Sequence, residues 1–289
     1  MWSSRWPGMD ILRYAAFSTD PAGGNPAGVV LDATGLDEAV MLAAAAEIGY
    51  SESAFLTGRR GDGGDFDIRY FSPKAEVPFC GHATVAAAVA VADHLTGPGE
   101  LLFHTRSGDV PVTVAAGRDG VMTATLTSVE PHVEAVAETD AAEALRLLGW
   151  AADDLDPALP PRIGYAGARH LVLAVRTRER LAALDYDFEG LAAYMTERDL
   201  TTLQLVHRQD AQTFHVRNPF PIGGVVEDPA TGAAAAALGA YLRDLGEVGP
   251  AAVLTLHQGE DMGRPGLLRV ELRDGDPRVR VSGTAVPIP

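Results

Sequence analysis

Two alanine-rich segments of the chain, residues 83–92 and 233–242, contain no charged side chain. A helix that is apolar on every face cannot lie on a protein surface and must be enclosed by other elements. The sequence therefore predicts two buried helices, each with a surrounding layer that shields it from water.

These two segments belong to an internal repeat. When Gly81 is aligned with Gly232, an arginine-bearing strand precedes each glycine, and a strand and turn follow each helix. Three elements that recur in the same order indicate two homologous halves. The matching segments are residues 69–73 with 217–219, residues 80–88 with 228–237, and residues 101–108 with 254–259.

Strands and outer helices complete each half. Alternating or β-branched residues predict strands at 28–31, 66–71, 110–114, 171–175, 213–217 and 267–272. Amphipathic stretches predict outer helices at 36–47, 140–148 and 189–196, with Asp140 as the N-cap of the second. We therefore predict an α+β fold of two pseudo-symmetric domains, each a curved mixed or antiparallel sheet wrapped around a buried central helix.

The repeat also sets the expected domain boundaries. Residues 9–130 form the first half and residues 131–274 the second, with a last strand at about 275–289 returning to the first half. Residues 1–8 lack the apolar core of a signal peptide and are expected to be a leader outside the fold. We expect the active site in the cleft between the halves.

The composition of the chain excludes several classes of binding partner. A formal net charge of −16 repels phosphate backbones and anionic lipid, so neither nucleic acid nor a membrane surface is expected to bind. The sequence contains no run of about 18 apolar residues, so no membrane span is predicted. The single cysteine, Cys80, cannot form an intrachain disulfide or a cysteine-based zinc cluster, and it fits a reducing compartment. We predict a cytoplasmic protein.

Each buried helix begins at a glycine-containing turn. The free N–H groups and the positive end of the helix dipole attract anions, and Gly81 and Gly232 allow a ligand close to the backbone. Two such starts would hold a carboxylate or a phosphate. The alternative is that they are ordinary helix starts, capped in the second half by Asp228 and Thr231.

Three side chains could move protons. Glu52 lies between a helix and a strand, among small and aromatic residues, and could act as a general acid/base. His82 could shuttle protons or orient a substrate. Asp228 could be a catalyst or a helix cap. Each also has a purely structural interpretation when it is considered alone.

The position equivalent to Cys80 in the second half is Thr231. A threonine hydroxyl is too weak an acid to replace a thiol, so racemisation by two opposed thiols is disfavoured. Cys80 itself is interpreted as a small buried apolar residue.

Five short motifs, in order, resemble the PhzF-like isomerase/epimerase family, which is named for the phenazine-biosynthesis isomerase and is related to diaminopimelate epimerase. They extend from near residue 10 to the C-terminus, so the resemblance covers nearly the whole chain. The motifs are residues 24–29 (GNPAGV), 51–55 (SESAF), 69–73 with 80–84 (RYFSP and CGHAT), 227–232 (EDPATG) and 258–265 (QGEDMGRP).

The resemblance implies a cofactor-free and metal-free isomerase, usually a homodimer, that acts on a small carboxylated metabolite. By the family's pattern, Glu52 is the general acid/base, and His82 and Asp228 assist it. Ser51, Cys80 and Thr231 line the substrate site. Backbone amides of Gly81, His82, Gly232 and Ala233 hold the carboxylate.

One position departs from the family's pattern. Where many members have serine after the Thr-Gly pair, this chain has Ala233, which favours a substrate other than that of the phenazine enzyme. Two alternatives stay open. One is a dehydratase or epimerase that uses Cys80 as a single thiol opposite Thr231; the other is a non-catalytic, small-anion-binding homodimer.

Overall fold

The computed structural model describes residues 9–61 and 63–289, so the predicted leader at residues 1–8 lies outside the described residues. The chain divides into two compact units. The N-terminal unit comprises the described residues up to Thr127 together with Ser282–Pro289, and the C-terminal unit comprises Ser128–Val281.

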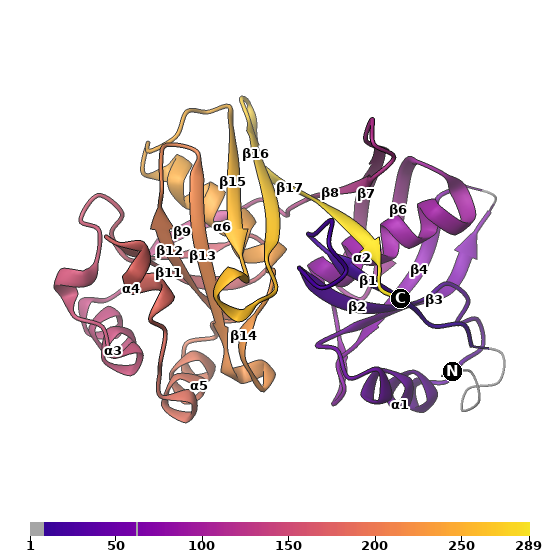
Figure 1. Cartoon of the computed structure of the whole chain (residues 1–289), viewed down its shortest axis with the longest axis horizontal. Coiled ribbons are helices and arrows are strands. Elements are labelled where there is room, and N and C mark those ends of the chain that lie inside the picture. Colours follow the sequence, from indigo (N-terminus) through magenta and orange to yellow (C-terminus); the bar gives the residue numbers. More distant parts are fainter. Residues whose placement is uncertain (1–8, 62) are drawn as a thin grey trace. The chain divides into compact units, whose positions relative to one another are not determined.

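The N-terminal unit is a mixed sheet with one central helix (Figure 1). Hydrogen bonding follows the order β1–β2–β3–β4–β6–β7–β8, and β17 pairs with β1 and with β8. Its elements are β1 (Leu12–Ala16), β2 (Asn25–Val30), α1 (Glu38–Ile48), β3 (Ser53–Arg60), β4 (Asp65–Phe71), β5 (Glu76–Val77), α2 (Gly81–Val91), a π-helical turn (Ala92–Thr96), β6 (Gly99–Thr105), β7 (Gly108–Ala116), β8 (Met122–Thr127) and the end of β17 (Asp276–Pro287).

The C-terminal unit repeats this plan with extra outer helices (Figure 1). Its strands follow the order β9–β10–β11–β12–β13–β15–β16–β17. Its elements are β9 (His132–Ala135), α3 (Glu138–Leu148), β10 (Arg162–Tyr165), β11 (Arg169–Val175), α4 (Arg178–Ala182), α5 (Phe188–Glu197), β12 (Thr202–Arg208), β13 (Thr213–Phe220), β14 (Val225–Asp228), α6 (Gly232–Asp244), β15 (Ala252–Gln258), β16 (Gly266–Arg273), the first part of β17, and 3₁₀ turns at Ala152–Asp154, Pro221–Gly223 and Glu260–Met262.

The strand directions show the repeat as clearly as the sequence does. In the N-terminal unit, β2–β3 and β4–β6 are parallel and the pair between them, β3–β4, is antiparallel. In the C-terminal unit, β11–β12 and β13–β15 are parallel and β12–β13 is antiparallel. All six strands predicted from the sequence are present, as parts of β2, β4, β7, β11, β13 and β16, although β2 ends at Val30, one residue before the predicted end at 31.

Both charge-free segments form the central helices that their composition predicts. In α2, every residue from His82 to Val91 is buried, and the helix packs against β1, β2, β3, β7 and β8. In α6, Gly232 and all residues from Ala234 to Leu242 are buried, and the helix packs against β9, β10, β11, β12 and β16. Small alanine side chains let the strands approach each helix closely on every side.

The outer helices cover the opposite faces of the sheets. In the N-terminal unit, α1 places Met41 and Ala44 against Phe55 and Phe71. In the C-terminal unit, α3, α4 and α5 pack leucines on the apolar face of β11 and β12. Among the described residues, no helix combines the length and the apolar character that a membrane span requires.

The prediction that Asp140 caps the helix at 140–148 is wrong. Helix α3 begins two residues earlier, after Ala137, which makes no side-chain cap hydrogen bond. Asp140 lies in the first turn, where its Oδ1 accepts hydrogen bonds from Arg198 Nε at 3.0 Å and Nη2 at 2.8 Å. Because Asp140 already lies within the helix, it is not at the cap position, and its carboxylate pairs instead with an arginine distant in sequence.

Gly239 in α6 tests how tightly the central helix is packed. A Cβ at this position would stand 2.7 Å from Val270 Cγ1 and 3.3 Å from Val279 Cγ1. Alanine would add about 1 kcal/mol of helix propensity, but overpacking costs about 1–3 kcal/mol. We expect Gly239→Ala to lower the free energy of unfolding by about 1 kcal/mol in urea denaturation. A more stable variant would show that the valines yield without cost.

His170 makes stability depend on pH. Its side chain is fully buried, its Nδ1 lies 2.8 Å from Thr202 Oγ1, and burial lowers its pKa from 6.5 to about 3. Between these values the unfolded chain binds a proton that the folded chain does not, so stability falls as the pH falls. We expect this group to contribute a loss of about 2–3 kcal/mol between neutral pH and about pH 4.5.

The measurement is urea denaturation at both pH values. In His170→Gln the loss of stability on acidification is expected to be smaller than in the wild type. His132→Gln, which changes a histidine whose side chain is 54% exposed, is the control and should retain the wild-type loss. Equal losses in all three proteins would contradict the assignment.

Candidate active site

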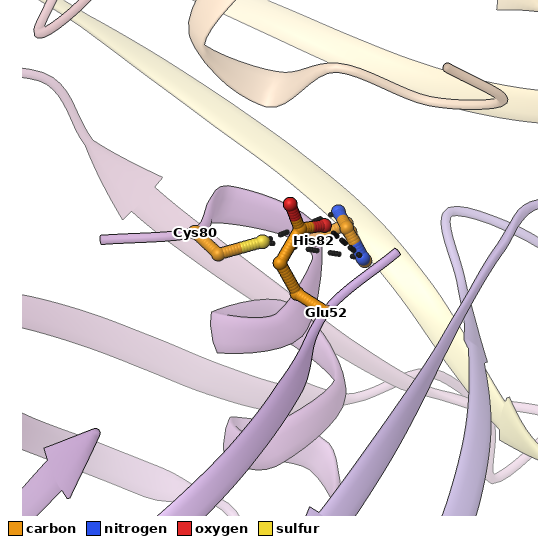
Figure 2. A group of neighbouring side chains, drawn as sticks. All are labelled: Glu52, Cys80 and His82. Carbon is orange, nitrogen blue, oxygen red and sulfur yellow. Dashed lines mark hydrogen bonds and ion pairs between the residues drawn. The ribbon is translucent and has the colours of Figure 1, made fainter. Parts of the chain in front are cut away.

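Glu52 is held at the junction between α1 and β3. Gly49 ends α1 in the left-handed conformation, with φ of 74°, and turns the chain toward the strand that begins at Ser53. The Glu52 side chain is 14% exposed, so its carboxylate is largely enclosed but still reaches solvent. Figure 2 shows it directed at the start of α2, toward the side chains of Cys80 and His82.

His82 lies at the centre of this group. Its Nε2 is 3.6 Å from Glu52 Oε2, and its Nδ1 is 3.4 Å from Cys80 Sγ (Figure 2). The same Nε2 is 3.4 Å from Ser51 Oγ. His82 is 4% exposed and Cys80 is 9% exposed. A carboxylate, an imidazole and a thiol thus lie within 4.8 Å of one another at one helix start, so small side-chain movements would let protons pass between them.

A chain of hydroxyl groups supports the start of α2. Thr84 Oγ1 donates to the Cys80 carbonyl at 2.6 Å and lies 2.7 Å from the Tyr70 hydroxyl. Because the Thr84 proton is used by that carbonyl, Tyr70 is the donor in the second bond. Burial raises the pKa of Tyr70, so the phenol keeps this proton. The Cys80 side chain makes no cap hydrogen bond to the helix.

The start of α6 carries a second polar group. Thr231 is the N-cap residue, but its side chain makes no cap hydrogen bond. Instead its hydroxyl donates to Asp228 Oδ2 at 2.5 Å. Asp228 is 8% exposed. The interpretation of these two residues as ordinary side-chain caps is therefore wrong for Thr231, because its hydroxyl oxygen accepts from Gln258 Nε2 and from no N–H of the helix.

Gln258 holds Asp228 and Thr231 together by hydrogen bonds, although it was not among the site residues predicted from the sequence. Its Oε1 accepts from the Thr231 N–H at 3.0 Å, and its Nε2 donates to the Asp228 carbonyl at 2.8 Å and to Thr231 Oγ1 at 3.0 Å. It is 1% exposed. The next residue, Gly259, must be glycine: its φ is +80°, and a Cβ would stand 2.3 Å from the Arg264 carbonyl oxygen.

The repeat also preserves an ion pair before each central helix. Arg69 of β4 donates from Nε and Nη2 to the two carboxylate oxygens of Glu76 of β5, at 2.7 and 2.5 Å. Arg217 of β13 does the same to Glu227 of β14, at 2.9 and 2.5 Å. Each pair joins the two strands of the antiparallel hairpin that leads into the helix.

The predicted site residues therefore fall into two groups, one in each unit. The first joins Ser51, Glu52, Cys80 and His82 at Gly81, the first residue of α2. The second joins Asp228 and Thr231 at Gly232 and Ala233, the first residues of α6. Cys80 is buried, as predicted, but its sulfur contacts an imidazole rather than only apolar groups. Within the described part of the chain, the side chains of Glu52, Cys80 and His82 form a group that could hold a metal ion.

Comparison with known proteins places the whole chain in one family. The family described as "Phenazine biosynthesis-like protein" matches residues 14–289. An uncharacterized isomerase of Escherichia coli (strain K12), YddE, is 33% identical over 300 residues, covering 96% of this chain and 95% of the relative. A trans-2,3-dihydro-3-hydroxyanthranilate isomerase of Pseudomonas fluorescens is 32% identical over 274 residues, covering 94% of each chain.

Solved structures agree with this family assignment. A PhzF-family phenazine biosynthesis protein of Bacillus anthracis has a TM-score of 0.87 at 26% identity, covering 97% of each chain. A hydroxyproline epimerase of Agrobacterium vitis has a TM-score of 0.66 at 11% identity, covering 98% of this chain and 92% of its own, and shows the fold alone. The predicted α+β fold of the diaminopimelate epimerase-like type and the predicted isomerase class are confirmed.

Proposed function

Because the chain belongs to the phenazine biosynthesis-like protein family and is an enzyme of the isomerase class, we propose that it moves a proton on a small carboxylated metabolite without a cofactor. Glu52 is the general acid/base. The observation that supports this role is its carboxylate, 14% exposed, with Oε2 3.6 Å from His82 Nε2 at the start of α2. The carboxylate takes a proton from one carbon of the substrate and returns it to another.

His82 and Ser51 orient the base. The imidazole Nε2 faces both the Ser51 hydroxyl and the Glu52 carboxylate, so it can hold the carboxylate in place and share its proton during the reaction. The Glu52 side chain is 14% exposed, so the proton that it carries can exchange with solvent, and turnover in D₂O therefore labels the substrate with deuterium.

The substrate carboxylate binds at helix starts. In α2, the N–H groups of Gly81 and His82 lie in the first turn, where the helix dipole favours a negative group. The sequence repeat leads us to assign the same role to Gly232 and Ala233 of α6, and an assisting role to Asp228 and Thr231. Ala233 offers its N–H but no hydroxyl, which favours a substrate with one fewer acceptor at that point. The homodimer that the family resemblance implies is part of this proposal.

A second candidate function is a single-thiol epimerase or dehydratase. It is favoured by the 3.4 Å contact between Cys80 Sγ and His82 Nδ1 at a helix start, because an imidazole and a helix dipole both stabilise a thiolate. The membership in an isomerase family favours either of these enzymes over the non-catalytic anion-binding alternative.

The test is proton exchange with solvent. The protein is incubated in D₂O with trans-2,3-dihydro-3-hydroxyanthranilate, the substrate named for one relative, and with a set of small amino, hydroxy and cyclic unsaturated acids. Deuterium incorporation is followed by mass spectrometry for the wild type and for Cys80→Ser. Incorporation into a carboxylic acid by both proteins supports the proposal. Incorporation that disappears in Cys80→Ser supports the single-thiol enzyme, and no incorporation into any of these acids by the folded wild type contradicts the proposal.

A further inference from the structure

Glu52, Cys80 and His82 offer one carboxylate, one thiol and one imidazole, with one ligand atom of each lying within 4.8 Å of the others (Figure 2). These are the three side-chain types that bind Zn²⁺ in proteins. Three protein ligands with a fourth position open to water is the usual arrangement where zinc stays accessible to small molecules.

The distances suit a zinc ion. With Zn–N and Zn–O bonds of about 2.1 Å and a Zn–S bond of about 2.3 Å, tetrahedral ligands stand about 3.4–3.6 Å apart. His82 Nε2 lies 3.6 Å from Glu52 Oε2 and 3.9 Å from Cys80 Sγ. These two pairs therefore need to close by only a few tenths of an ångström, and the carboxylate and the sulfur, which lie within 4.8 Å of each other, must also approach to bind one ion. Nε2 is the ligand nitrogen, because it lies beside the Glu52 carboxylate, and the imidazole must turn slightly toward the sulfur, which lies nearer to Nδ1, at 3.4 Å.

The exposure and the rigidity of the three side chains are also compatible with a metal site. Cys80 and His82 lie at the start of α2, which the enclosing sheet holds in place, so the sulfur and nitrogen are preorganised. Glu52 comes from the separate α1–β3 junction and is the most exposed of the three, so its carboxylate can close over an entering ion. Side chains from two segments then enclose the metal.

We propose that Glu52, Cys80 and His82 form a Zn²⁺ site and that the bound ion inhibits the enzyme. Binding releases the Cys80 thiol proton to solvent, because only the thiolate is a strong ligand. The inhibition, unlike the binding, rests on the proposed function: a Glu52 carboxylate whose charge is shared with Zn²⁺ is a much weaker base and no longer takes a proton from substrate. Proton transfer stops while the ion is bound and returns when a chelator removes it.

Binding is tested without substrate, using Co²⁺ as a coloured stand-in for Zn²⁺. The full-length protein is treated with chelator, freed of it, and titrated with Co²⁺. We expect a thiolate-to-cobalt charge-transfer band in the near ultraviolet and the visible absorption of a four-coordinate site, both abolished by added Zn²⁺. Cys80→Ser should lack the charge-transfer band, and Cys80→Ser and His82→Gln should each bind Zn²⁺ at least about tenfold more weakly by calorimetry.

The control is His104→Gln. His104 forms a similar histidine–carboxylate pair, with Nδ1 2.7 Å from Asp109 Oδ1, but no cysteine adjoins it, so this variant should keep the band. Thermal unfolding checks that each variant is folded. No charge-transfer band in folded wild type, or a band that persists in Cys80→Ser, overturns the site.

Inhibition is read separately, from deuterium exchange with and without Zn²⁺. Loss of exchange on adding Zn²⁺ and recovery with chelator support the proposal, and undiminished exchange in the zinc-loaded protein overturns the inhibitory role. Because cobalt absorption needs no substrate, failure of the metal site and failure of the proposed reaction are distinguishable.

Discussion

Glu52→Gln is expected to lower the rate of deuterium exchange into the substrate by about 10²–10⁴-fold, the usual contribution of a positioned general acid/base. Glutamine keeps the shape of the side chain and can still hydrogen-bond to His82, but it has no carboxylate that accepts a proton from carbon. Since the side chain is 14% exposed and lies outside the apolar core, the variant should fold normally. Substrate binding should therefore change much less than turnover.

Two controls make this result specific. Glu138→Gln removes an exposed carboxylate from the first turn of α3 and should leave exchange unchanged. Cys80→Ser should keep most of the exchange activity if Glu52 is the base. Full activity in Glu52→Gln together with loss in Cys80→Ser would reverse the roles and establish the single-thiol enzyme. Full activity in both variants would show that neither Glu52 nor Cys80 takes part in the reaction.

The central helices could be predicted because burial follows directly from their composition. Residues 83–92 and 233–242 carry no charge, so no surface position suits them, and the repeat shows that the same element occurs twice. Helices α2 and α6 begin slightly earlier, at Gly81 and Gly232. The turn glycines are thus the first helical residues, and this is why the motifs around them mark the helix starts.

The contacts of the site could not be predicted in the same way. Glu52 and His82 were each recognisable as titratable residues in short motifs, but their contact joins separate segments whose spacing depends on how β3 lies beside α2. Gln258 is a stronger example. It lies at the end of β15, where the motif of residues 258–265 begins, but its contacts with Thr231 and Asp228 join segments 27 and 30 residues apart and cannot be deduced from the motif itself.

The two equivalent ion pairs could not be predicted from the sequence either. Arg69 and Arg217 mark the same place in the two halves of the sequence, but their partners do not lie at matching distances. Glu76 follows Arg69 by 7 residues, whereas Glu227 follows Arg217 by 10. Because the two separations differ, aligning the two halves of the sequence does not place Glu76 opposite Glu227. The alignment therefore does not show that both units have this ion pair. Only the hairpin pairing of β4 with β5 and of β13 with β14 reveals it.

Glu227→Gln is expected to lower the free energy of unfolding of the C-terminal unit by about 3–5 kcal/mol, because it leaves a buried guanidinium without its counter-charge. The side chain of Arg217 is 9% exposed and that of Glu227 is 6% exposed. Arg217 would keep the Ala182 carbonyl at 2.7 Å, and its nearest remaining carboxylate would be Asp261, at 4.0 Å. Urea denaturation followed by the fluorescence of Trp150, which is buried in the same unit, measures the loss.

The N-terminal unit supplies the matched comparison. Arg69 is 23% exposed and would keep Glu38 at 2.7 Å, so Glu76→Gln should cost only about 1–2 kcal/mol, measured by far-ultraviolet circular dichroism. In the C-terminal unit, Arg217→Met combined with Glu227→Leu should recover much of the stability lost in Glu227→Gln, because no unpaired charge stays buried. If the double variant is as unstable as Glu227→Gln, the loss comes from the shape of the hairpin rather than from an uncompensated charge. The ion pair would then act by positioning the strand that carries Asp228.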